Sequence, residues 1–200
     1  MLRKLLLTLS ATILFGSAAW ADITPEKNDD GLYVQEWFLD SFLELNDDLE
    51  EADAEGKRLV VFFEQKGCIY CKKIHTEVLS NETINEFVRD NFVVVQLNLF
   101  GDREVTDFDG DVLSEKQLAR KWGVLFTPTI MAFPEASELS DDPASGDKIA
   151  VAKMPGAFGK GTFLSFFSWV KEKGYKDEAS HFQAYVSKKI PELREAGLLK

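Results

Sequence analysis

The chain has 200 residues, of which 45% are hydrophobic, and its formal net charge at pH 7 is −11. This length and composition fit one globular domain with a substantial core, to which sixteen phenylalanines contribute. No internal repeat is visible. Because an acidic chain is repelled by phosphate backbones, we expect no nucleic-acid partner.

The first 21 residues have the three parts of a secretory signal peptide. Arg3 and Lys4 form a basic start, residues 5–15 are apolar, and Ala-Trp-Ala at 19–21 is a small-x-small cleavage site. The apolar run is too short for a membrane anchor, and no lipid-anchoring cysteine or twin-arginine motif is present. We therefore expect cleavage after Ala21 and a soluble periplasmic protein.

The next segment contains a polar start, a helix and a strand. Residues 22–32 are polar, and we expect them to be loose. From Ser41 to about Glu55, apolar residues recur at helical spacing, and Gly56 ends the pattern. The apolar positions of this expected helix are Phe42, Leu45, Leu49 and Ala52. The continuous apolar run from Arg58 to Glu64 is typical of a strand covered on both faces.

The only two cysteines, Cys68 and Cys71, follow this strand directly and form a C-x-x-C pattern. The exit of a buried strand and the entrance of a helix is a position suited to thiol–disulfide chemistry. Free backbone N–H groups and the helix dipole ease ionisation of Cys68 to the nucleophilic thiolate. Cys71 shares an inward-facing helical stripe with Ile74 and Val78, where it can resolve a mixed disulfide.

The cysteine pair has two interpretations other than redox chemistry. A structural zinc site needs four ligands, but the chain has no second cysteine pair, and its histidines are His75 and His181. His75 would lie roughly 10 Å along a helix from Cys68, too far to join both sulfurs on one metal. An inert disulfide is disfavoured because so short a loop constrains the unfolded chain little. We expect no metal and no cofactor, and we expect both histidines at the surface or in packing contacts.

The rest of the chain alternates between strand and helix patterns. A capping box at Ser114 and Gln117 opens one helix, and Gly123 ends it after Trp122. The last helix is expected to end before Pro191. The expected elements are a helix at 82–89, a strand at 92–97, a helix at 114–122, a strand at 129–133, a polar connection at 134–147, an antiparallel edge strand at 148–153, a helix at 161–173 and a short helix at 182–189.

This order of elements, β-α-β-α-β-β-α with an added N-terminal helix, resembles the thioredoxin family. Three sequence features add to the resemblance: the strand ending in Cys68-Ile69-Tyr70-Cys71, the segment 123–129 with its proline, and Gly156-Ala157 before the last long helix. The resemblance implies an α/β thioredoxin fold, with a central mixed sheet flanked by helices. It divides the chain into a signal peptide at 1–21, an N-terminal extension and helix at 22–56, a thioredoxin-like domain at 57–174 and a helical C-terminal tail at 175–200.

The resemblance also assigns substrate-binding residues. In thioredoxins the proline that matches Pro128 is cis, and the backbone of the preceding residue, here Thr127, pairs with an extended substrate peptide. A cis X-Pro bond costs only about 0.5–1 kcal/mol more than trans, so a fold can hold one. We therefore expect Thr127, Pro128 and Tyr70 to bind substrate. The alternative for Pro128 is an ordinary proline at a strand entrance.

Several positions before the first cysteine depart from the thioredoxin pattern. The family's buried aspartate, six residues before that cysteine, is replaced by Phe62. Glu64, two residues later on the same strand face, is a candidate catalytic proton shuttle in its place. The alternative for Glu64 is a rim carboxylate without a role. Gly67 replaces a tryptophan and leaves the sulfur open, and Lys66 adds a charge that favours the thiolate.

More narrowly, residues 57–133 resemble the periplasmic thioredoxins called SoxW, which are associated with sulfur oxidation, although Ile69 stands where members often carry proline. The motifs that carry this resemblance are Phe63-Glu64-Gln65, His75-Thr76-Glu77-Val78-Leu79 and Thr106-Asp107-Phe108-Asp109-Gly110. It implies a periplasmic disulfide reductase that receives electrons from a membrane thiol transporter. The implied substrates are disulfide-containing exported proteins, among them the sulfur-oxidation carrier protein, and cytochrome c maturation is a second pathway.

Other functions stay open. The same residues running in reverse would make a thiol oxidase, because direction depends on the reduction potential. An isomerase is less favoured because no dimerisation segment is visible, and we expect a monomer. A binding or chaperone module with an inert bridge is the non-catalytic alternative. Residues 107–111 suggest a calcium loop, but Val112 and Leu118 stand where an EF-hand has glycine and glutamate.

Overall fold

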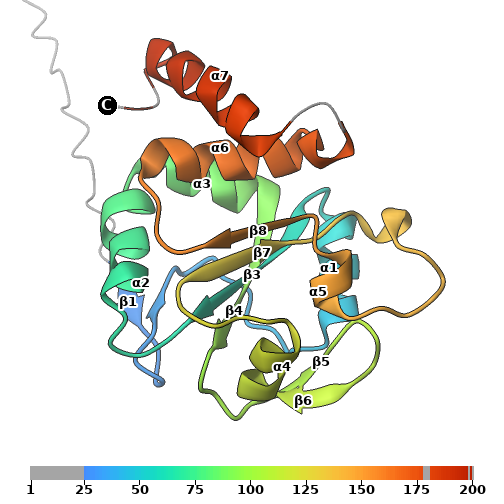
Figure 1. The fold of residues 1–200 in the computed structure, drawn as a ribbon. Helices are drawn as coiled ribbons and strands as arrows, with labels where there is room; N and C mark the ends of the chain where they lie inside the picture. Colours follow the sequence, from blue (N-terminus) through green and yellow to red (C-terminus); the bar gives the residue numbers. More distant parts are fainter. Residues whose placement is uncertain (1–24, 178–180, 198, 200) are drawn as a thin grey trace, which may run out of the picture.

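The computed structural model describes residues 25–177, 181–197 and 199 (Figure 1). The expected signal peptide therefore lies outside the described residues. The main sheet has four strands in the order β4-β3-β7-β8. Strand β4 runs parallel to β3, whereas β7 is antiparallel to both β3 and β8. The strands are β3 (Arg58–Glu64), β4 (Phe92–Asn98), β7 (Thr129–Ala132) and β8 (Ala152–Pro155).

Helices cover both faces of this sheet (Figure 1). One face packs against α1 (Leu45–Ala54) and α4 (Glu115–Lys121), around buried side chains that include Phe63 and Trp122. The other face is covered by α2 (Ile69–Lys73), the π-helix η1 (Ile74–Val78), α3 (Glu82–Asn91) and α6 (Lys160–Lys171). Because side chains alternate along a strand, Glu64 shares this second face with Phe62. The arrangement is the α/β thioredoxin fold that the order of elements predicts.

Local sequence explains the elements that agree with prediction. The bounds of β3 are those expected, and α3 begins where Asn81 accepts the backbone N–H of Ile84 at 3.1 Å. The capping box before α4 is present, with the Ser114 N–H donating to the Gln117 side chain at 2.9 Å. Gly123, with φ of 61°, follows this helix, as predicted.

The N-terminal extension is more ordered than predicted. Strand β1 (Glu26–Lys27) pairs antiparallel with β2 (Tyr33–Val34), although residues 22–32 were expected to be loose. The turn between the strands is closed by Asn28, whose side chain accepts the N–H of Leu32 at 2.9 Å. Leu32 is itself only 1% exposed, so burial of one apolar side chain holds a polar segment in place.

Helix α1 starts later than predicted, at Leu45 rather than Ser41. The Ser41 hydroxyl accepts the N–H of Leu43 at 2.6 Å, and Leu43 has a positive φ of 65°. This local turn competes with helix formation at its own residues. Phe42, expected on the apolar face of the helix, is instead 97% exposed.

A hairpin that the sequence analysis did not predict lies between β4 and α4. Its strands are β5 (Glu104–Thr106) and β6 (Val112–Ser114), and its loop carries the suspected calcium motif. The ammonium of Lys121 lies 2.7–2.8 Å from carboxylate oxygens of Asp107, Asp109 and Asp111. A protein cation therefore offsets part of the negative charge of the loop. Within the described residues, no group of three or more His, Cys, Asp or Glu side chains could hold a metal ion.

The edge strand is shifted from its predicted place. Residues 148–153 were expected to form it, but α5 (Gly146–Ile149) precedes β8, which starts at Ala152. The Ser145 hydroxyl and the Gly146 N–H both donate to the buried Asp107 carboxylate, at 2.8 and 3.0 Å. These bonds hold the chain in a turn of helix, which delays the strand.

The tail forms a longer helix than predicted. Helix α7 (Phe182–Glu195) continues through Pro191, where the sequence pattern indicated an end. It packs on the outer side of α6 (Figure 1), and its Leu193 is only 6% exposed. The packing of α7 therefore offsets the free-energy cost of the helix hydrogen bond that Pro191 cannot donate. Two short 3-10 turns, η2 (Ala136–Glu138) and η3 (Gly174–Lys176), complete the described elements. No helix in the described part of the chain has the length and apolarity needed to cross a bilayer.

Candidate functional site

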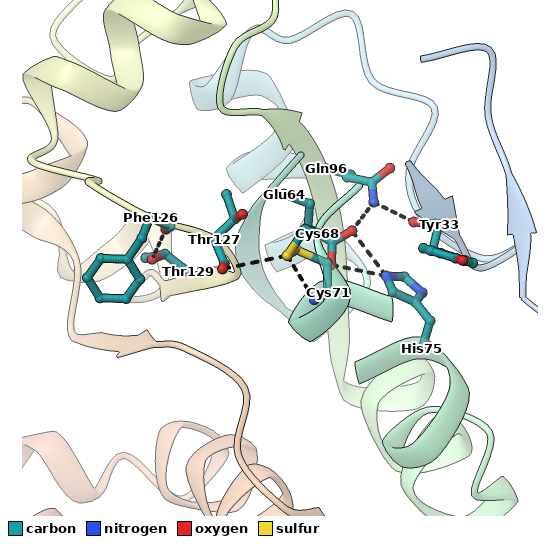
Figure 2. The surroundings of a disulfide bond; sticks show 9 residues. All are labelled: Tyr33, Glu64, Cys68, Cys71, His75, Gln96, Phe126, Thr127 and Thr129. Atoms are coloured by element: carbon teal, nitrogen blue, oxygen red, sulfur yellow. Dashed lines mark hydrogen bonds and ion pairs between the residues drawn. A yellow bond between two sulfur atoms is a disulfide. The ribbon is translucent and has the colours of Figure 1, made fainter. Parts of the chain in front are cut away.

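The centre of the candidate site is a disulfide between Cys68 and Cys71 (Figure 2). Cys68 is the N-cap residue of α2, and its sulfur accepts the backbone N–H of Cys71 at 3.0 Å. Gly67, with φ of 78°, turns the chain from β3 into this helix. Cys68 is partly exposed, whereas Cys71 is only 2% exposed. The structure thus shows the asymmetry expected of an attacking and a resolving cysteine.

The loop before β7 faces the disulfide. The peptide bond between Thr127 and Pro128 is cis, and the Thr127 carbonyl oxygen lies 3.6 Å from the sulfur of Cys68. The Pro128 carbonyl accepts the N–H of Gly156 at 2.7 Å, which ties the loop to the turn after β8. Residues that are far apart in the sequence therefore meet at one sulfur atom.

A groove and several exposed apolar side chains lie on the elements that carry the site. A surface groove of about 640 Å³ runs beside α2 and η1, with Tyr70 and Phe158 in its lining. Lys73 and Lys160 also line it, opposed by one carboxylate, that of Glu77. Tyr70, the predicted substrate-binding residue of α2, is 53% exposed. The other large exposed apolar residues in α2 and in the segments near the site are Ile69, Leu125 and Phe126.

Glu64 is the end residue of β3 and is completely buried. Its carboxylate lies 3.1 and 3.2 Å from Nε2 of His75, and Gln96 donates to it at 2.5 Å (Figure 2). The interpretation of Glu64 as a rim carboxylate is therefore wrong. Phe62, at the position of the thioredoxin aspartate, packs in the apolar core.

His75 has a more specific place than the sequence analysis expected. It is completely buried and hydrogen-bonded, whereas His181 is exposed at the start of α7. The backbone around His75 is a π-helix, in which Leu79 N–H reaches back to the Ile74 carbonyl at 2.8 Å. Its spacing of four residues from Cys71 was a signal that could have found it, because such positions are neighbours on a helix.

The N-terminal segment supplies partners that sequence reasoning missed. Gln35 lies 3.1 Å from Nδ1 of His75, and the Tyr33 carbonyl accepts from Gln96 at 2.6 Å. The Phe38 ring packs against both His75 and Phe62. No local pattern marks these residues, because their partners lie on other elements. Lys66, expected beside the thiolate, extends its aliphatic stem past Gly31 in the hairpin turn.

Comparison with known families agrees with this geometry. Residues 45–141 match the family model described as the thioredoxin-like domain. This match agrees with the thioredoxin fold of the structure. The match begins at α1 and includes the cysteine pair, Pro128 and β7. No curated protein matches the sequence. Because the matching model is the broad thioredoxin-like domain, the SoxW resemblance stays a prediction.

Solved structures are similar to this chain at low sequence identity. A thioredoxin-fold protein from Helicobacter pylori is 18% identical, with a TM-score of 0.51, over 70% of this chain and 86% of that one. A thioredoxin from Thermus thermophilus is 24% identical, with a TM-score of 0.49, over 66% and 86%. A structure titled DsbH oxidoreductase is 14% identical, with a TM-score of 0.41, over 82% and 93%. At this identity the similarity to the Helicobacter protein is evidence for the fold alone.

Proposed function

We propose that the protein is a thiol–disulfide oxidoreductase of the periplasm that reduces disulfides in exported proteins. The observation that carries the proposal is the placement of Cys68. This residue is partly exposed at a helix N-terminus, and its sulfur accepts one backbone N–H and faces the Thr127 carbonyl, while Cys71 is buried. A thiolate at such a position is stabilised by the same N–H and by the helix dipole.

The reaction follows from this asymmetry. In the reduced protein, Cys68 attacks a substrate disulfide and forms a mixed disulfide, because it is the sulfur that a substrate can reach. Cys71 then attacks Cys68, releases the reduced substrate and restores the bond between the two cysteines. We assign Thr127 and Pro128 to pairing with the substrate backbone, and Tyr70 to contact with its side chains. Glu64 is the proposed proton acceptor for Cys71.

The physiological partners are proposed from the resemblance to SoxW. A membrane thiol transporter supplies electrons to the cysteine pair. The substrates are disulfide-containing exported proteins, with the sulfur-oxidation carrier protein as one substrate and the cytochrome c maturation pathway as a second setting. The protein acts as a monomer, without a metal or a cofactor.

Reduction of insulin by a dithiol donor tests the activity. Wild-type protein is expected to turn over, and neither Cys68→Ser nor Cys71→Ser should do so. Persistent inactivity with a disulfide that resists mild reductants would favour the alternative of a binding or chaperone module. The reduction potential of the pair then separates a reductase from an oxidase, because direction depends on that potential.

Trapping in cells identifies the partners. Cys71→Ser is expected to accumulate mixed disulfides through Cys68, because no second thiol remains to release the substrate. Cys68→Ser is the matched control and should trap neither substrates nor a membrane donor. A folded and exported Cys71→Ser protein that yields no reducible adducts would exclude an exchange centre.

A further inference from the structure

We propose that a chain of hydrogen bonds from the N-terminal segment sets the tautomer of His75, and that His75 thereby positions Glu64 to accept the proton of Cys71. The inference rests on the proposed function, because it concerns the proton step at the same cysteine pair. His75, Gln35 and Asn85 are positioning residues in this proposal, and Glu64 is the group that takes the proton.

The series of hydrogen bonds begins at the Trp37 indole, a group that can only donate. The indole N–H of Trp37 lies 3.0 Å from Oδ1 of Asn85. Nδ2 of Asn85 then faces two oxygens, the Leu79 carbonyl at 2.9 Å and Oε1 of Gln35 at 3.0 Å. Since an indole nitrogen only donates and a carbonyl oxygen only accepts, both ends agree on the orientation of the Asn85 amide.

The orientation of the Gln35 amide determines which nitrogen of the His75 imidazole carries the proton. Because Oε1 of Gln35 accepts from Asn85, its amide nitrogen faces Nδ1 of His75, at 3.1 Å. An amide nitrogen offers only hydrogens, so Nδ1 must carry a lone pair. The single proton of the neutral ring therefore sits on Nε2, which lies 3.1 Å from the nearer oxygen of Glu64. A second proton on Nδ1 would point at the Gln35 amide hydrogens.

Gln96 completes the surroundings of the carboxylate. Its amide nitrogen donates to the Tyr33 carbonyl at 2.6 Å and to Oε2 of Glu64 at 2.5 Å. Glu64 thus receives hydrogen bonds from His75 and Gln96 and is completely buried. Such an environment holds an unprotonated carboxylate in place without solvent, which is the form that can accept a proton.

His75 links Glu64 to the helix that carries Cys71. Cys71 and His75 are four residues apart on one continuous helical segment, α2 followed by η1, and both are buried. Residues at this spacing are neighbours on a helix face. Glu64, which is bonded to the His75 ring, enters the same space from the end of β3 (Figure 2). Phe62 leaves no carboxylate at the thioredoxin position.

The resolving step moves one proton and exchanges one disulfide bond. In a mixed disulfide between Cys68 and a substrate sulfur, the Cys71 thiol gives its proton to Glu64. The Cys71 sulfur attacks the Cys68 sulfur, the bond to the substrate breaks, and the substrate leaves as a thiolate that takes up a proton. One disulfide forms between the cysteines, and the substrate disulfide is reduced to two thiols.

Other titratable groups face this network from neighbouring elements. The Tyr33 ring lies 6.0 Å from the His75 ring. The ammonium of Lys27, on the paired strand of the hairpin, lies 4.7 Å from the Tyr33 ring. Arg103, beyond β4, donates to the Gln96 backbone carbonyl at 2.9 Å. Because these groups face the network, the test uses variants that leave Tyr33, Lys27 and Arg103 in place.

Nitrogen NMR of the wild-type protein tests the tautomer directly. The chain has two histidines, and the exposed His181 provides a second imidazole signal for comparison. We expect His75 to show an unprotonated Nδ1 and a protonated Nε2 at neutral pH. An Nδ1–H tautomer, or an imidazolium at neutral pH, would overturn the proposal. His181→Gln removes the His181 signal, so the signal that remains belongs to His75.

The rate of the resolving step tests the role of the network. Reduced protein is mixed with increasing oxidised glutathione, and the rate at saturation reports attack of Cys71 on the Cys68–glutathione disulfide. We expect Glu64→Gln to slow this step by about 100-fold at neutral pH, the low end for general base catalysis. We expect His75→Phe to slow it in the same direction and to change its pH profile. His75→Gln, whose amide can still donate to Glu64, should restore most of the rate, and His181→Gln should change nothing.

The two proposals fail in different ways. An unchanged rate and pH profile in Glu64→Gln would overturn this inference, even if wild-type protein reduces insulin. Wild-type protein that fails to reduce insulin would overturn the proposed function, while the glutathione rates would still decide the proton step. If His75→Phe does not fold, the NMR measurement on wild-type protein still decides the tautomer.

Discussion

The sulfur of Cys68 lies 3.6 Å from the carbonyl oxygen of Thr127, across a separation of 59 residues. This contact joins the N-terminus of α2 to the loop before β7. A peptide that pairs with the backbone of Thr127 would therefore lie beside the sulfur that attacks it. The contact explains how a loop without a reactive group can govern the chemistry of a thiol on another element.

Removal of the Thr127 backbone donor is expected to weaken substrate pairing. We predict that Thr127→Pro shortens the lifetime of the protein adducts trapped by Cys71→Ser, because proline has no N–H to pair with the substrate. Adducts with glutathione, which is too short to pair along the loop, should persist as before. Thr127→Ala keeps the backbone donor and is the control. Equal lifetimes in all three proteins would exclude the assigned pairing.

The two cysteines should differ in their reaction with alkylating agents after reduction. We predict that Cys68 is labelled first and Cys71 much more slowly, because Cys68 is partly exposed and Cys71 is only 2% exposed. Labelling time courses at several pH values, followed by peptide mapping, measure this difference. Faster labelling of Cys71 would reverse the assigned roles.

The Asp107 carboxylate is expected to be a centre of stability. It is completely buried and accepts from Trp122, Ser145 and the Gly146 N–H, with the Lys121 ammonium 2.8 Å away. We predict that Asp107→Ala lowers the free energy of unfolding by on the order of 3 kcal/mol, because it leaves a charge and several donors without their acceptor. Urea unfolding measures the change.

The matched control for this prediction is Asp111, whose side chain is 63% exposed although it also contacts Lys121. Exposed ion pairs contribute about 0–1 kcal/mol, so Asp111→Ala should have little effect. Addition of calcium should leave the melting temperature of wild-type protein unchanged. A calcium-dependent rise would restore the metal interpretation of the loop.

The free energy of unfolding is expected to depend on pH through the Asp48 carboxyl. Burial raises the pKa of this carboxyl from 3.8 to about 6, against the Ser41 hydrogen bond that lowers it, and the nearby acids raise it further. A raised pKa means that the folded state holds the proton more tightly than the unfolded state. This contribution is full below pH 4 and is lost as pH rises to about 6.

Asp48→Asn should therefore stabilise the protein at pH 7 and flatten this part of the pH profile. A shift of about two pKa units corresponds to at most about 3 kcal/mol, and we expect a gain of about 1–2 kcal/mol because asparagine keeps an acceptor for Ser41. Urea unfolding at pH 4, 5.5 and 7 measures the profile. Asp47→Asn, on the exposed side of the same turn, is the control. A loss of stability in Asp48→Asn at pH 7 would contradict the prediction.

Local sequence was sufficient for the centre of the fold and of the site. The apolar run of β3, the C-x-x-C pattern and the capping box of α4 act over a few residues, so their structures could be predicted. The pattern of Cys71, Ile74 and Val78 also placed the resolving cysteine inside correctly. In each case the periodicity of buried side chains, or a cap bond within one turn, determines the conformation.

Only the tertiary structure decided what lies behind the cysteines and how the outer elements end. Glu64 became a buried, bonded carboxylate because His75, Gln96 and the N-terminal segment close around it, and no local pattern links these residues. Likewise, packing on α6 carried α7 through Pro191, and bonds to Asp107 delayed β8. The sequence alone thus determined the central elements and the position of the cysteine pair, through interactions within a turn or a strand. The surroundings of Glu64 and the boundaries of the outer elements depend on contacts between distant residues, which exist only once the chain has folded.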